Sequence, residues 1–233
     1  GRILRDGQLL RLDFGILTLH MVLTASFVVV PLVLRDVGFA PPRHWLLYLP
    51  VMVLAITLTI PFIIVAEKKR KLKPVLLGAI AALALALLGM GVLGESLGAM
   101  ALWLLLFFTA FNLLEATLPS LVAKFAPADA RGTAMGVYSS AQFIGAFIGG
   151  AAGGGLHGQY GPHSVFLFGA AALVLWWLAA LGMRQPRYLA SHLLKVGEMT
   201  AAQAARLASE LLAVRGVAEA VVWGEEGVAY LKV

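Results

Sequence analysis

Residues 97–122 read LGAMALWLLLFFTAFNLLEATLPSLV, an apolar run in which Glu115 is the only charged residue. A helix of about 20 apolar residues crosses the roughly 30 Å hydrocarbon core of a bilayer. This stretch therefore predicts a transmembrane helix that carries one carboxylate.

Five more stretches of this kind are found at residues 14–34, 45–66, 75–93, 132–156 and 164–183. Hydrophobic residues make up 61% of the chain and charged residues 13%, and the mean hydropathy is +0.90. A water-soluble domain has no core large enough for so much apolar surface. The sequence predicts an all-α membrane bundle of six transmembrane helices over residues 1–184, surrounded by the lipid bilayer.

The basic residues are distributed unevenly among the loops. Of the 18 Lys and Arg residues, only Arg35 and Arg43 lie in the loops of one side. Because positive charge is retained on the inner side, both termini are predicted to be cytoplasmic. The net charge of +6 follows from this topology. It is divided among separate loops, which excludes the continuous basic face of a nucleic-acid-binding protein.

The composition becomes that of a soluble domain after a predicted hinge at residues 185–188 (Gln-Pro-Arg-Tyr). Thr200 and Gln203 form a capping-box pattern that predicts the start of a helix. The alternating segments predict strands at residues 191–196, 217–223 and 228–233. The order β-α-β-β predicts a small α+β domain at 189–233, ferredoxin-like but truncated. An open sheet edge invites pairing, which predicts self-association through this domain.

Glu115 is the sharpest functional candidate, with Asn112 one turn before it. A carboxylate inside a span is costly, so it is expected to face the bundle interior or a water-filled cavity. The functional interpretation is a protonatable or substrate-contacting site. The alternative is a structural acid that pairs with Lys124, Arg131 or a basic loop.

His20 lies inside the first span and could relay protons, although a buried, hydrogen-bonded histidine is the simpler interpretation. Tyr138 and Gln142 are four residues apart and share a face of the fifth span. They either line a cavity or form interhelical hydrogen bonds. The small-xxx-small pairs Gly132/Gly136 and Gly145/Gly149 predict a helix-packing surface.

No enzyme motif is found, and the chain contains no cysteine. Disulfides, thiolate metal sites and thiol nucleophiles are thereby excluded. His157 and His163 flank a loop with no carboxylate near them, which makes a poor metal site. The sequence therefore predicts a protein that is not an enzyme and that holds neither a metal nor a cofactor.

Three segments resemble the C-terminal half of major facilitator superfamily transporters: residues 111–121 (FNLLEATLPSL), 127–138 (PADARGTAMGVY) and 142–150 (QFIGAFIGG). The likeness is to drug-efflux-type members that end in a cytoplasmic ferredoxin-like domain. It implies that the six spans are spans seven to twelve of a bacterial inner-membrane carrier. The missing partner is then an N-terminal six-helix half, and a start at Gly1 without Met predicts a fragment.

The family's basic loop motif is matched by residues 67–71 (EKKRK), but Arg70 and Ile63 stand where the family pattern has glycine. The resemblance implies a cytoplasmic gating role for Glu67, Lys68, Arg70, Lys71 and Arg131. It implies a substrate and proton pathway for Glu115, Asn112, Tyr138, Gln142 and His20.

The implied activity is proton-coupled efflux of small organic molecules by alternating access. Two alternatives remain open. One is a membrane anchor whose soluble domain binds a partner, and the other is an uptake carrier of the same superfamily.

Overall fold

A computed structural model describes residues 3–185, 191–217 and 219–232. The chain divides into two compact units, residues 1–186 and 187–233. The predicted hinge at 185–188 lies outside the described residues except for Gln185.

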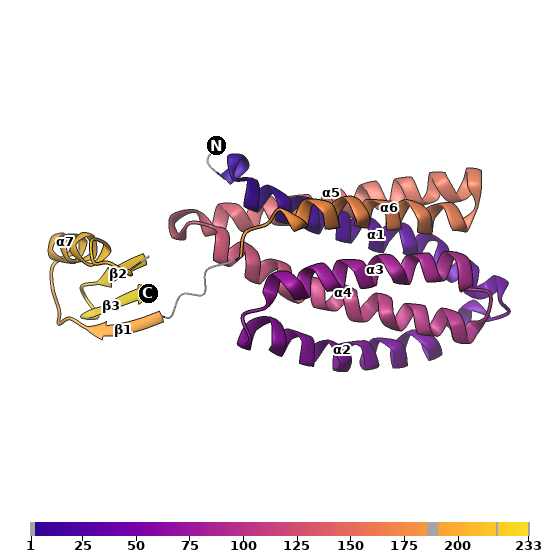
Figure 1. Cartoon of the computed structure of the whole chain (residues 1–233), viewed down its shortest axis with the longest axis horizontal. Coiled ribbons are helices and arrows are strands. Elements are labelled where there is room, and N and C mark those ends of the chain that lie inside the picture. The colour runs from indigo at the N-terminus through magenta and orange to yellow at the C-terminus, as the bar shows by residue number, and fades with distance from the viewer. Residues whose placement is uncertain (1–2, 186–190, 218, 233) are drawn as a thin grey trace. The chain divides into compact units, whose positions relative to one another are not determined.

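Six long helices make up the first unit (Figure 1). They are α1 (Gly7–Asp36), α2 (Trp45–Lys68), α3 (Leu72–Leu93), α4 (Leu97–Phe125), α5 (Arg131–Tyr160) and α6 (Pro162–Leu181). Short 3-10 turns, Ile3–Arg5, Pro41–Arg43 and Ala128–Ala130, lie before α1, α2 and α5. α1 packs mainly against α5 and α6, α3 against α4 and α6, and α2 against α4.

Among the described residues, five helices are long and apolar enough to cross a membrane: α1, α2, α3, α4 and α6. α5 has 30 residues, but the glycines and polar residues that fill it lower its hydropathy. The sequence predicted a sixth span here. The helix is present over nearly the predicted range, and it lies along α1.

α1 and α5 run side by side with their backbones in direct contact. A Cβ added at Gly145 would collide with the Leu17 carbonyl, and one at Gly149 with the Met21 carbonyl. Both helices advance four residues between these contacts, so they are parallel. Small residues four apart allow such an approach in lipid, where packing takes the place of the hydrophobic effect.

We call the contact between α1 and α5 at Gly145 and Gly149 the α1–α5 seam. Two further contacts extend this seam. The Thr24 hydroxyl donates a hydrogen bond of 2.9 Å to the Ala146 carbonyl. A Cβ added at Gly153 would lie 2.8 Å from the Ala25 Cα. The seam therefore covers about two turns of each helix, from Leu17 to Ala25 on α1 and from Gly145 to Gly153 on α5.

Gly132 and Gly136 lie on a different face of α5. A Cβ added at either meets no described atom within 4 Å. Nine residues separate Gly136 from Gly145, which turns it about 180° around the helix. This first pair therefore makes no close helix contact among the described residues, and its predicted packing role stays a prediction.

Basic side chains hold the C-terminal end of α6. Lys73 Nζ donates to the carbonyls of Leu181 at 2.8 Å and Met183 at 2.6 Å. Arg11 Nη1 donates to the Gly182 carbonyl at 2.9 Å. The last carbonyls of a helix are unpaired and carry partial negative charge, so cations stabilise them. The ends of α1, α3 and α6 are joined in this way.

The second unit contains β1 (Ser191–Lys195), α7 (Ala201–Leu212), β2 (Glu219–Trp223) and β3 (Val228–Lys232). The strands form an antiparallel sheet in the order β1-β3-β2, with His192 opposite Leu231 and Ala220 opposite the same residue. α7 packs on β2. The capping box of Thr200 and Gln203 is confirmed, and so is the β-α-β-β order.

Candidate functional site

A polar cluster joins three helices inside the bundle. His20 of α1 lies between Glu115 of α4 and Gln142 of α5. Its Nδ1 is 3.6 Å from Glu115 Oε1, and its Nε2 is 2.8 Å from Gln142 Nε2. Three of the five predicted pathway residues therefore come together, although they are far apart in the sequence.

The orientation of the Gln142 amide favours one tautomer of His20. The amide nitrogen of Gln142 can only donate, so Nε2 of the ring accepts. A neutral ring then carries its proton on Nδ1, the nitrogen that faces Glu115. The imidazole edge also meets the Phe111 ring, with centroids 5.9 Å apart. His20 is thereby oriented toward the carboxylate.

Asn112 and Tyr138 line the same region. Asn112 precedes Glu115 by one turn of α4, and Tyr138 precedes Gln142 by one turn of α5. The Tyr138 hydroxyl interacts electrostatically with the carboxylates of Glu115 and of Asp13 from α1. Four of the five predicted pathway residues thus lie close together, and Asn112 is one helical turn from Glu115.

Several polar atoms of this cluster are buried without a hydrogen-bond partner among the described residues: Asp13 Oδ2, Asn112 Nδ2, Glu115 Oε1 and Tyr138 Oη. Each such group costs about 1–3 kcal/mol of stability. Unpaired buried polar groups are rare in native proteins, and ionisable residues within a membrane span are candidates for a functional site.

Asp13 is the residue that the sequence interpretation missed. The predicted span began at Phe14, which left Asp13 in the preceding segment, whereas α1 begins at Gly7. Asp6 caps this longer helix by accepting from the backbone N–H groups of Gln8 at 2.7 Å and Leu9 at 3.2 Å. The available signal was the seven-residue spacing to His20, which places both side chains on one face of a helix.

The alternative ion pair of Glu115 with Lys124 is not formed. Lys124 Nζ instead donates to both carboxylate oxygens of Glu67, each at 3.1 Å. Ser120 donates to Glu67 Oε1 at 2.6 Å. This group joins the end of α2 to α4 and includes the first residue of the predicted gating loop. Arg131, the other proposed partner of Glu115, begins α5.

The remaining loop residues occupy different positions. Lys68 ends α2 and is exposed, and Lys71 precedes α3 and lines a groove. Arg70 has a left-handed backbone, with φ of 54°. Its N–H bonds to the Glu67 carbonyl, and the next N–H, of Lys71, bonds to the Ala66 carbonyl. This is the Schellman ending of a helix, which favours glycine at the left-handed position.

Gly38 occupies the equivalent position after α1, with φ of 88°. Its N–H bonds to the Arg35 carbonyl, and the next N–H, of Phe39, bonds to the Leu34 carbonyl. The same backbone turn thus ends both helices, with glycine in one case and arginine in the other. The left-handed backbone at position 70 explains why the family pattern has glycine there.

Arg70→Gly is expected to raise the free energy of unfolding by about 1 kcal/mol, because a Cβ in the left-handed region costs about that much. Arg70→Ala removes the same charge but keeps the Cβ, so it should bring no such gain. Unfolding by SDS in mixed micelles would measure both variants. Equal shifts in the two would assign the effect to charge and refute the backbone explanation.

His157 of α5 and His163 of α6 are the two histidines beside the loop between these helices. His163 Nδ1 contacts the Gly91 carbonyl. In the described part of the chain, no group of three His, Asp or Glu side chains is arranged to hold a metal ion.

Comparison with known proteins identifies the family of this half-bundle. Residues 12–223 match the Major Facilitator Superfamily. The chain is 40% identical over 232 residues to the "Inner membrane transport protein YajR" of Escherichia coli (strain K12), covering 100% of this chain and 51% of that protein. It is 27% identical over 203 residues to the "Multidrug resistance protein MdtH" of Klebsiella pneumoniae (strain 342), covering 80% and 50%.

A third relative, an "Uncharacterized transporter" of Buchnera aphidicola subsp. Baizongia pistaciae (strain Bp), is 27% identical over 187 residues, which are 77% of this chain and 46% of that protein. The chain spans about half the length of the curated relatives it matches. The resemblance inferred from the sequence is confirmed: this chain belongs to the Major Facilitator Superfamily of membrane transporters.

Proposed function

We propose that this chain is the C-terminal half of a proton-coupled efflux carrier for small organic molecules. The observation that carries the proposal is the His20–Glu115–Gln142 cluster, which connects three helices and leaves polar atoms unpaired. An intramembrane ionisable cluster of this kind is characteristic of proton relays and substrate pathways. An acidic cluster also suits cationic substrates.

In this mechanism Glu115 and His20 share the proton. Glu115 Oε1 has no hydrogen-bond partner among the described residues and lies 3.6 Å from His20 Nδ1, so it can accept a proton or a cationic group of the substrate. Gln142 keeps His20 Nδ1 directed at Glu115. Loading of one proton changes the charge of the cluster by one unit. That change favours one of the two alternating-access states over the other.

The α1–α5 seam suits this proposal because it makes two helices of the site one rigid body. Alternating access rocks one half of a carrier against the other around a central site. The N-terminal six-helix half is therefore the required partner. The seam keeps His20 and Gln142 at a constant separation while the halves move.

We further place the carrier in a bacterial inner membrane with both termini in the cytoplasm. The uneven distribution of basic residues supports this orientation, and the E. coli relative is named as an inner-membrane transport protein. The name of the Klebsiella relative, a multidrug resistance protein, supports efflux. The β-α-β-β unit would then be a cytoplasmic regulatory or stabilising module that can pair through its sheet edge.

The complete protein in proteoliposomes tests this proposal. Substrate should move against its concentration when a pH gradient is imposed, and a protonophore should abolish this accumulation. Exchange of labelled for unlabelled substrate needs no gradient and should persist. Accumulation that is unaffected by the protonophore would overturn proton coupling, and absence of both activities would overturn transport.

A further inference from the structure

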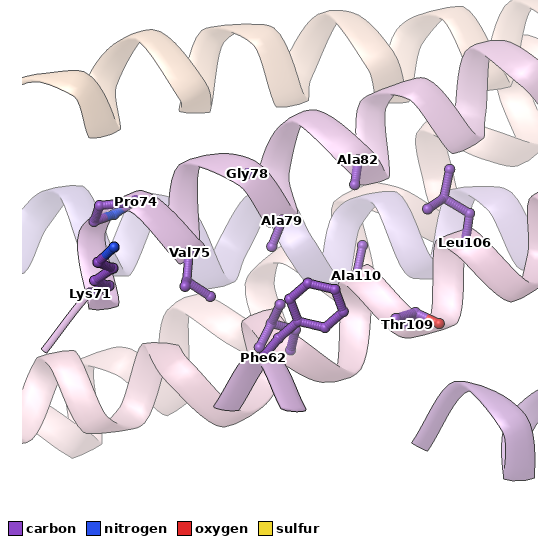
Figure 2. A pocket seen from close by; sticks show the side chains of 11 residues that line it. Phe62, Lys71, Pro74, Val75, Gly78, Ala79, Ala82, Leu106, Thr109 and Ala110 are labelled. Carbon is purple, nitrogen blue, oxygen red and sulfur yellow. The ribbon is translucent and has the colours of Figure 1, made fainter. Parts of the chain in front are cut away.

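A groove of about 390 Å³ is lined by α2, α3 and α4 (Figure 2). We call it the α2–α3 groove. Its walls include Phe62 of α2, Gly78 and Ala82 of α3, and Leu106 of α4, and Lys71 stands at one end. The side chains are small along α3 and apolar throughout the middle, which leaves room for an elongated apolar group.

The polar side chain in the floor of the groove is already satisfied. Thr109 Oγ1 donates to the Leu105 carbonyl of its own helix at 2.7 Å. The Thr109 carbonyl accepts from Thr59 Oγ1 at 3.2 Å. The groove body therefore offers an occupant apolar contact and no unmet hydrogen bond, and lysine is confined to one end.

The groove faces away from the polar cluster. On α4 it is lined by Leu106 and Ala110, whereas Glu115 belongs to the cluster. Five residues separate Ala110 from Glu115, which is about 140° around the helix. A partner half that covers the cluster therefore leaves the groove turned toward the lipid.

The length of the groove matches one leaflet of a bilayer. Eleven residues of α3 separate Lys71 from Ala82, which is about 16 Å of helix. Half of a hydrocarbon core of about 30 Å is about 15 Å. Lys71 therefore lies at headgroup depth when Ala82 lies near the midplane. It belongs to the basic segment at residues 68–71, and such segments attract anionic headgroups.

We propose that the α2–α3 groove binds one anionic phospholipid, with an acyl chain along α3 and the headgroup phosphate at Lys71. The apolar walls, the leaflet-sized depth and the single terminal cation are complementary to such a molecule. A zwitterionic lipid fits the apolar walls equally well but gains less at Lys71. The site does not depend on transport, so it is testable separately from the proposed function.

Native mass spectrometry of the full-length protein in detergent would test the site with phosphatidylglycerol and phosphatidylcholine of identical acyl chains. Wild type should bind its first phosphatidylglycerol molecule about fivefold more tightly than its first phosphatidylcholine molecule. One lysine near an anionic lipid contributes about that factor. Lys71→Gln should remove this preference. Lys69→Gln is the matched control, because Lys69 carries the same charge in the same loop but does not line the groove.

Filling the groove provides the second arm. Gly78→Leu has room for its Cβ, since no described atom lies within 4 Å, and it should weaken binding of both lipids at the first site. Gly98→Leu on α4 has the same free space and should leave binding unchanged. Ala82→Leu fills the groove from the same helix and replaces Gly78→Leu if that variant misfolds.

The outcomes separate the occupants. Equal losses in Lys71→Gln and Lys69→Gln would show a diffuse electrostatic surface and overturn the site. Unchanged lipid binding in folded Gly78→Leu or Ala82→Leu would overturn it as well. Equal binding of the two lipids by wild type would refute the role of Lys71 and leave a non-selective apolar groove.

Discussion

Gly149→Leu is expected to destabilise the membrane bundle by about 3 kcal/mol or more. Overpacking a well-packed core costs about 1–3 kcal/mol, and here the collision is with backbone. A Cβ at 149 would collide with both the Met21 carbonyl and the Thr24 hydroxyl. The added side chain can be accommodated only if α1 and α5 separate, which would also lengthen the bond from Thr24 to Ala146.

The neighbouring residue supplies the control for this prediction. Gly150 is a glycine of the same helix, and a Cβ there meets no described atom within 4 Å. Gly150→Leu should change the free energy of unfolding by less than about 1 kcal/mol, because the added side chain collides with no described atom near its Cβ. Steric trapping or SDS unfolding would measure both. Similar losses in the two variants would show that helix α5 tolerates no large residue anywhere, and would remove the special role of the seam.

Glu115→Gln is expected to reduce proton-driven accumulation by the complete carrier by about tenfold or more. Glutamine keeps the shape of the side chain but neither ionises nor carries a proton. The loss of one charge-assisted interaction of about 1.5 kcal/mol corresponds to that factor. Gradient-independent exchange should be retained, because the substitution removes a proton site and leaves the neighbouring side chains in place.

Glu95→Gln is the matched substitution for this test. Glu95 is exposed between α3 and α4, so its loss removes the same charge at a distance from His20. Accumulation should stay at the wild-type level. If Glu115→Gln also accumulated substrate at the wild-type rate, Glu115 would be excluded from the proton pathway. If exchange were lost together with accumulation, Glu115 would belong to substrate binding.

The sequence was sufficient for features that depend on local chemistry. The capping box at Thr200 is set by residues three apart, and the strand pattern around the Gly224–Gly227 turn is equally local, so both appear in the structure nearly as predicted. The span limits were less accurate at α1, because a hydropathy boundary stops at Asp13 whereas the hydrogen-bonded helix continues to its cap at Asp6.

The meeting of the site residues could not be predicted from any local pattern. His20 and Gln142 are 122 residues apart, and their contact depends on the register of the α1–α5 seam. The glycine pattern alone did not distinguish the two pairs, although helical geometry places Gly136 on the opposite side from Gly145. The packing of the neighbouring helices decides which face of α5 meets α1. This depends on tertiary contacts, which a local sequence pattern does not contain.

The seam has a consequence for biogenesis. α5 is less apolar than the other five long helices of the bundle. Its transfer from the translocon into lipid is therefore expected to be less favourable than that of the other helices. Its glycines acquire a partner only where the α1 backbone is already in place. The ribosome completes α1 roughly a hundred residues before it completes the seam on α5. We therefore expect correct insertion of the fifth helix to require the first helix, and a ribosome that stalls between them to leave α1 without its contact to α5.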